Sequence, residues 1–253
     1  MRKLFIVAFY VFFVMISSCG SVEEEQVFET KEEEEIIIDN IEESEDNTSE
    51  ENTTNFKLLS LGDSYTIGQS VCETCRFPEQ LKDSLLKKFN DEKIIDLKVI
   101  AKTGWTTTNL INAIEREMIS SDFDLVTLLI GVNNQYQHRD FSIYESEFPM
   151  LIETSIKAAK DDKSNVIVIS IPDYAFTPFG NGNTSISAEI DQYNNFAKSY
   201  CDQNGITFVN ITDITRQGLL NTSLVASDNL HPSEIAYSKF VELILPSSLE
   251  ILE

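Results

Sequence analysis

Two short motifs near opposite ends of the chain carry residue types suited to nucleophilic chemistry. An apolar run, 58–61, ends in Gly62-Asp63-Ser64. This pattern predicts a buried strand that enters a tight turn, with Ser64 at the start of a helix. Far downstream, Asp228 precedes His231 by three residues. A serine hydroxyl needs a base to take its proton, so we expect His231 to serve Ser64 and Asp228 to orient His231.

Two further motifs have the groups that such a site needs to stabilise an oxyanion. Lys102-Thr103-Gly104-Trp105 and Gly131-Val132-Asn133-Asn134 each follow an apolar run. Preorganised donors are required at the oxyanion, and the backbone N–H groups of Ser64 and Gly104 and the side-chain amide of Asn133 can supply them. Each residue also has a purely structural interpretation, because Ser64 and Asn133 suit helix N-caps and Gly104 suits a turn.

Apolar runs alternate with helical patterns from residue 56 onward. We expect strands at 56–61, 94–101, 124–130, 165–171 and 207–211, and helices at 78–89, 108–119, 143–159, 187–201 and 233–245. Nearly continuous apolar strands that alternate with helices are typical of a parallel sheet covered on both faces. The carboxyl ends of such strands share one edge, so the four motifs can converge there.

The four motifs resemble, in order, the four sequence blocks of the SGNH, or GDSL-type, hydrolase family: Gly62-Asp63-Ser64, Gly104, Gly131-x-Asn133 and Asp228-x-x-His231. The resemblance covers almost all of 56–253. It implies an α/β, three-layer flavodoxin-like fold with a five-stranded parallel sheet, and an esterase or lipase activity without a metal or other cofactor. By the family's pattern, Ser64 is the nucleophile, His231 the base and Asp228 its partner, while Ser64, Gly104 and Asn133 form the oxyanion hole.

Two residues depart from that pattern. Tyr65 stands where the family usually has leucine, and Asn134 stands where many members have aspartate. We expect the first to affect packing more than chemistry. The second is not a core catalytic position.

The first 19 residues have the features of an export signal. A basic start, Met1-Arg2-Lys3, precedes an unbroken apolar run from Leu4 to Ile16. These 13 residues are too few for a membrane-spanning helix, which needs about 20, but they suit a signal peptide. The next residues, Ser17-Ser18-Cys19, resemble a bacterial lipobox. We therefore expect 1–19 to be a lipoprotein signal ending at a lipidated Cys19, the alternative being an ordinary signal peptide.

The stretch 20–55 is strongly acidic. It holds 15 Asp and Glu against one basic residue, Lys31, and so carries −14 of the chain's net charge of −23. Acidic blocks with few aromatic residues stay solvated, so we expect a disordered tether between a lipid anchor in the cell envelope and a hydrolase domain at 56–253. The apolar cluster Ile36-Ile37-Ile38 is a candidate docking strand. The strong negative charge argues against nucleic acid as a partner.

The remaining cysteines have structural rather than catalytic interpretations. In an exported protein, a short-loop disulfide between Cys72 and Cys75 is the default expectation, with a plain loop as the alternative. No second Cys/His pair is present to complete a zinc site. A thioredoxin-like role would place the pair at a helix start after a strand, and Ser64 already occupies such a place. We expect Cys201 to be a buried, inert thiol.

Export and tethering favour a small-molecule or glycan ester as the substrate. The leading hypothesis is an esterase that removes acetyl or another short acyl group from carbohydrate-like substrates at the cell envelope. A second is a lysophospholipase or thioesterase-like activity, with a longer acyl chain in a groove of aromatic residues: Trp105, Tyr136, Phe176 and Phe179. A third is a non-catalytic binding module. We expect no part for His138, the second of two histidines.

Overall fold

A computed structural model describes residues 55–253. The predicted signal peptide, Cys19, the Ile36–Ile38 cluster and all of the acidic stretch 20–55 except Asn55 lie outside the described residues. Asn55, expected in the tether, is the first residue of the first strand. Within 55–253, no helix is both long and apolar enough to cross a bilayer.

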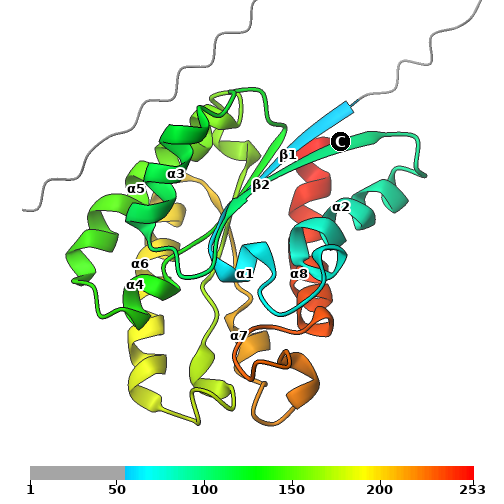
Figure 1. Cartoon of the computed structure of the whole chain (residues 1–253). Coiled ribbons are helices and arrows are strands. Elements are labelled where there is room, and N and C mark those ends of the chain that lie inside the picture. Colours follow the sequence, from blue (N-terminus) through cyan, green and yellow to red (C-terminus); the bar gives the residue numbers. More distant parts are fainter. Residues whose placement is uncertain (1–54) are drawn as a thin grey trace, which may run out of the picture. The chain divides into compact units, whose positions relative to one another are not determined.

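The described residues form one α/β unit around a five-stranded parallel sheet (Figure 1). The strands are β1 (Asn55–Gly62), β2 (Ile94–Ala101), β3 (Leu125–Leu129), β4 (Val166–Ile169) and β5 (Thr207–Val209). Their order in the sheet is β2-β1-β3-β4-β5, and every neighbouring pair is parallel. The order therefore reverses beside β1, which is where open α/β sheets place their sites.

Helices cover both faces of this sheet. They are α1 (Ser64–Ile67), α2 (Phe77–Lys88), α3 (Thr107–Glu117), α4 (Val132–Tyr136), α5 (Phe141–Ala158), α6 (Thr184–Asn204), α7 (Thr212–Thr215) and α8 (Glu234–Leu252). The pair α2 and α8 pack together on one face, and α3, α5 and α6 pack on the other (Figure 1). The three-layer α/β fold expected from the sequence is confirmed.

The sheet is the centre of the hydrophobic core. Every residue of β3 and β4 is buried, because a parallel sheet with helices on both faces has no solvated side. Two buried hydroxyl groups join the central strands, since Thr127 Oγ1 of β3 donates to Ser60 Oγ of β1 at 2.9 Å. The core therefore holds β1 and β3 rigidly, and the site loops leave from their ends.

The helix boundaries lie one to three residues from the predicted ones, except at the end of α8. The expected stop at Leu245 is wrong, because α8 continues through Pro246 to Leu252. Proline removes one helical hydrogen bond, but Leu249 and Leu252 still pack against the core, and this contact supports the extra turns. The helix expected at 108–119 does not continue through Met118 in the structure. Met118 instead ends α3 with a φ of +45° and is 85% exposed.

Candidate active site

Ser64 lies at the point where β1 passes into α1. Asp63 caps this short helix, since its Oδ1 accepts a hydrogen bond from the Tyr65 N–H at 3.0 Å. Gly62 is required by close packing, because a Cβ there would lie 2.1 Å from Thr66 Oγ1. Ser64 is thereby held at the carboxyl end of the central strand, with only 3% of its surface exposed.

Gly104 and Asn133 come from the loops after β2 and β3, the two strands that flank β1. Gly104 has a φ of +82°, and a Cβ at this position would meet no atom within 4 Å, so its backbone borders open space. Asn133 belongs to α4, and its Nδ2 donates to Asp63 Oδ2 at 3.5 Å. Two neighbours tie these loops together: Asn134 accepts from the Thr107 N–H at 3.0 Å, and Gln137 Nε2 donates to the Gly104 carbonyl at 2.8 Å.

Asp228 and His231 form a tight turn before α8. His231 Nδ1 lies 2.6 Å from Asp228 Oδ2, and Asp228 Oδ1 accepts from the His231 and Leu230 N–H groups at 2.9 Å each. Burial acts to raise the pKa of Asp228, but hydrogen bonds from Ser70 and from the backbone and ring of His231 hold that pKa well below its usual range. The ionised carboxylate therefore keeps the Nδ1 proton on the imidazole, which leaves Nε2 free to accept a proton.

A single cavity of about 200 Å³ brings these groups together. Its lining residues are Ser64, Tyr65, Thr103, Gly104, Val132, Asn133, Tyr136, Tyr174, Phe179, Leu230 and His231. The predicted nucleophile, base and three oxyanion donors thus line the same cavity. Asp228 does not line it but contacts His231 Nδ1. Among the described residues, no hydrogen bond joins Ser64 to His231, so the two are neighbours in the cavity rather than a bonded pair.

Two buried groups beside the cavity have shifted pKa values. Burial raises the pKa of Asp63 to about 7, against hydrogen bonds from Tyr65 and Asn133 that lower it. Burial also raises the pKa of Tyr65 well above its usual value. The Tyr65 ring packs against the His231 imidazole with centroids 5.1 Å apart. Tyr65, which stands where the family usually has leucine, therefore packs an aromatic ring against the predicted base.

The aromatic residues around the cavity differ in part from the predicted groove. Tyr136 and Phe179 line it, and both are about half exposed. Trp105 packs against the core, and neither Trp105 nor Phe176 lines the cavity. Tyr174 completes the aromatic set, with its ring centroid 6.0 Å from that of Tyr136 and 6.3 Å from that of Phe179.

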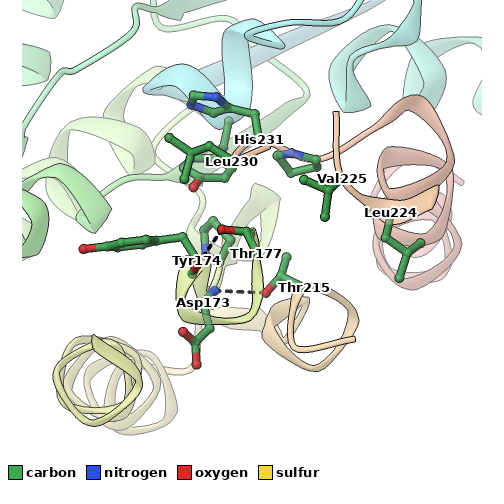
Figure 2. Close-up of a pocket in the computed structure, with 11 residues that line it drawn as sticks. Asp173, Tyr174, Thr177, Thr215, Leu224, Val225, Leu230 and His231 are labelled. Carbon is green, nitrogen blue, oxygen red and sulfur yellow. Dashed lines mark hydrogen bonds between the residues drawn. The ribbon is translucent and has the colours of Figure 1, made fainter. Parts of the chain in front are cut away.

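A second, much smaller cavity of about 10 Å³ lies behind His231. Figure 2 shows Leu230 and His231 across this space from the turn that begins at Asp173. The turn is fixed by a 2.9 Å hydrogen bond from the Asp173 N–H to Thr215 Oγ1, and by ion pairing of the buried Asp173 carboxylate with Arg216 Nε at 2.9 Å. This turn therefore lies beside the segment that contains His231, and it places Tyr174 in the lining of the main cavity.

The cysteines take the structural places expected for them. A disulfide joins Cys72 and Cys75 in the loop before α2. Cys201 is fully buried and unpaired in the described chain, and burial raises its pKa to about 12. His138 is exposed in a loop and does not line the cavity. No cluster of three or more metal-ligating side chains occurs within 55–253.

Sequence reasoning did not predict the part of Ser70 or Gln137. Ser70 Oγ donates to Asp228 Oδ2 at 2.6 Å across 158 positions of sequence, and Gln137 reaches back to Gly104 across 33. Neither belongs to a motif or an apolar pattern. Only the tertiary structure brings these donors to their acceptors.

Solved structures show the same fold at low sequence identity. Axe2, an acetylxylan esterase from Geobacillus stearothermophilus, is 20% identical, with a TM-score of 0.61 over 78% of this chain and 95% of its own. The lipase Lip_vut3 from a goat rumen metagenome is 17% identical, with a TM-score of 0.62 over 76% of this chain and 97% of its own. LAE5, an alpha/beta hydrolase from the metagenome of Lake Arreo in Spain, is 17% identical, with a TM-score of 0.61 over 79% and 98%.

Sequence comparison identifies the family. No curated protein matches the chain significantly. The sequence profile of the GDSL-like Lipase/Acylhydrolase family, however, matches residues 60–239, a range that includes all four motifs and every residue assigned to the cavity. The chain therefore belongs to the GDSL-like lipase/acylhydrolase family and is a serine ester hydrolase.

Proposed function

We propose that this protein removes short acyl groups, acetyl above all, from carbohydrate-like esters by a Ser64 mechanism. His231 takes the Ser64 proton as the hydroxyl oxygen attacks the ester carbonyl, and returns it to the departing alcohol. Water then attacks the acyl-enzyme with the same base, which releases the carboxylic acid and restores Ser64. Asp228 orients His231 throughout.

The oxyanion of each tetrahedral intermediate is stabilised by three donors. These are the N–H groups of Ser64 and Gly104 and the Asn133 amide. Preorganised donors of this kind need no rearrangement as charge develops. The observation that supports the mechanism is the one cavity that Ser64, Gly104, Asn133 and His231 all line.

The size of the cavity favours a short acyl group. At about 200 Å³, the cavity is smaller than most small-molecule ligand pockets, which measure roughly 300–1,000 Å³. An acetyl ester fits this space together with part of its alcohol, whereas most of a sixteen-carbon chain would lie outside. The half-exposed rings of Tyr136 and Phe179 at the cavity offer apolar faces to the alcohol part.

The same two rings support a second candidate, hydrolysis of longer acyl esters. A chain that leaves the cavity over Tyr136 and Phe179 would bury apolar surface against them. A non-catalytic binding module is less favoured, since such a protein has no use for an imidazole held by a carboxylate beside a serine.

A panel of p-nitrophenyl esters from acetyl to palmitoyl, run beside acetylated sugars, tests the proposal. We expect kcat/KM to be highest for acetyl and to fall with chain length, with acetate released from the sugars. Ser64→Ala is the matched inactive control. A maximum at long chains would favour the second candidate, and no turnover on any ester would favour the binding module.

We also propose that the enzyme is held at the cell envelope by a lipid on Cys19, with 20–55 as a tether. The support is the lipobox-like Ser17-Ser18-Cys19 after the apolar run. Cys19→Ser should move the protein out of the membrane fraction and abolish labelling by radioactive palmitate. Unchanged fractionation, with no label on the parent, would refute the anchor.

A further inference from the structure

One oxygen of Asp228 accepts two side-chain hydrogen bonds of equal length. Oδ2 lies 2.6 Å from His231 Nδ1 and 2.6 Å from Ser70 Oγ. The other oxygen is occupied by backbone N–H groups of Leu230 and His231, which belong to the same turn. Ser70 is therefore the donor that holds this carboxylate from outside its own loop.

The loop that carries Ser70, residues 68–76, has its two ends in contact. Gly68 and Arg76 are packed together, since a Cβ on Gly68 would lie 2.6 Å from that of Arg76. The Cys72–Cys75 disulfide lies between them. Ser70 has a φ of +68°, in the left-handed region that residues with a side chain seldom adopt, and such a conformation persists where the surroundings enforce it. The loop thus holds Ser70 in a conformation that a free chain would seldom adopt.

A second contact joins this loop to the segment that contains His231. Gln80 Nε2 donates to the Cys75 carbonyl at 2.6 Å and to the Glu234 carbonyl at 3.2 Å. Glu234 begins α8, three residues after His231. The loop that carries Ser70 and the segment from Asp228 to Glu234 are therefore joined at two places. One is the Asp228 carboxylate and the other is the Gln80 side chain.

We propose that Ser70 is a positioning residue for Asp228 and that the Cys72–Cys75 loop holds Ser70 in place. This inference rests on the proposed function, because the orientation of Asp228 matters only if His231 is the base. The Ser70 hydroxyl stops the carboxylate from rotating, so Oδ2 stays opposite His231 Nδ1. Ser70 does not line the substrate cavity, so its effect falls on kcat and leaves KM unchanged.

Two substitutions at Ser70 separate the effect of the hydroxyl from that of the backbone conformation. Ser70→Ala and Ser70→Gly both remove the donor, and glycine also relieves the positive φ, so the second variant folds even if the first is unstable. On p-nitrophenyl acetate, we expect each to lower kcat about ten-fold, the usual size of one hydrogen bond to a charged group, with KM nearly unchanged.

Ser164→Ala is a matched control. Ser164 Oγ also donates to an aspartate, Asp162 Oδ1, at 2.6 Å, but in an exposed turn that precedes β4. We expect parent-like kcat and KM. A Ser70→Gly variant that folds normally with parent-like kcat would overturn the positioning role, as would a loss that appears in KM rather than in kcat.

The disulfide is tested by a double-mutant cycle. Cys72→Ser/Cys75→Ser should lower kcat by no more than Ser70→Ala does, because the loop acts through that one hydroxyl. Adding Cys72→Ser/Cys75→Ser to Ser70→Ala should cause little further loss of kcat, because the hydroxyl through which the loop acts is already gone. Fully additive losses would overturn the claim that the loop works through Ser70.

Ser64→Ala, assayed in parallel, keeps this inference separate from the proposed function. If Ser64→Ala is inactive and Ser70→Gly is parent-like, only the positioning role fails. If Ser64→Ala turns over the ester like the parent, the proposed mechanism itself fails.

Discussion

The His231 imidazole and the Asp228 carboxylate meet at 2.6 Å, three residues apart in one turn. The same carboxylate also accepts the His231 backbone N–H, so both the ring and the main chain of this residue are fixed by one partner. This arrangement makes His231 the candidate base in structural terms, whereas the motif alone indicated only that the two residues could reach each other.

The first prediction is that Ser64 and His231 act as a unit. Ser64→Ala removes the nucleophile and His231→Ala removes its base, so each single loss of kcat should nearly equal that of the double variant. Steady-state hydrolysis of a p-nitrophenyl ester, with circular dichroism to verify folding, measures this. Losses that multiply in the double variant would contradict it.

The second prediction concerns Asn133. Its amide lines the cavity beside Ser64, so Asn133→Ala should lower kcat roughly 10²–10³-fold, the usual loss for one oxyanion donor. His138→Ala is the control, because that exposed residue does not line the cavity and should leave kcat unchanged. A loss confined to KM would show that Asn133 binds the ground state rather than the oxyanion.

The third prediction compares two glycines with positive φ. At Gly104, a Cβ meets open space, so Gly104→Ala should carry mainly backbone strain of roughly 1–2 kcal/mol. At Gly131, with a φ of +131°, a Cβ would lie 2.7 Å from Tyr144 Cε2 in the core. Gly131→Ala should therefore lower the free energy of unfolding more than Gly104→Ala does. Urea unfolding measures both, and equal losses would contradict the packing argument.

The main architecture was predictable because its signals are local. The range predicted for the second strand, 94–101, matches β2 (Ile94–Ala101), since a buried strand and its turn residues are read from neighbours in sequence. The position of Ser64 followed likewise from an apolar run that ends at Gly62. The same run predicts a helix start at Ser64, where α1 begins. The short helices α4 and α7 are not predicted, because four or five residues show no helical period.

What could not be predicted depends on contacts between distant segments. Ser70 has no local signal, and its acceptor lies 158 residues away. Trp105 and Phe179 look equally suited to a groove in the sequence, yet the first packs on the core and the second lines the cavity. The continuation of α8 past Pro246 similarly depends on apolar contacts that outweigh a local breaker.

The last prediction follows from the buried carboxyl of Asp63. Burial raises its pKa from 3.8 to about 7, so the folded protein binds this proton more tightly than the unfolded chain does. Protonation of Asp63 therefore stabilises the fold fully below pH 3.8. This stabilisation decreases as the pH rises toward about 7 and is absent above that pH. At 1.36 kcal/mol per pKa unit, the full loss is about 4 kcal/mol.

Asp63→Asn removes this titration while keeping an oxygen that can accept the Tyr65 N–H. The new amide faces the Asn133 amide, which changes the free energy of unfolding by an amount that does not depend on pH. The informative quantity is therefore how the difference in this free energy between variant and parent changes with pH. We expect the free energy of unfolding of Asp63→Asn, relative to the parent, to increase steadily from pH 4 to about pH 7 and to level off above it. Urea unfolding at four pH values across this window measures the slope. A difference that stays constant with pH would mean that Asp63 is ionised throughout in the folded protein, held so by the Tyr65 and Asn133 hydrogen bonds.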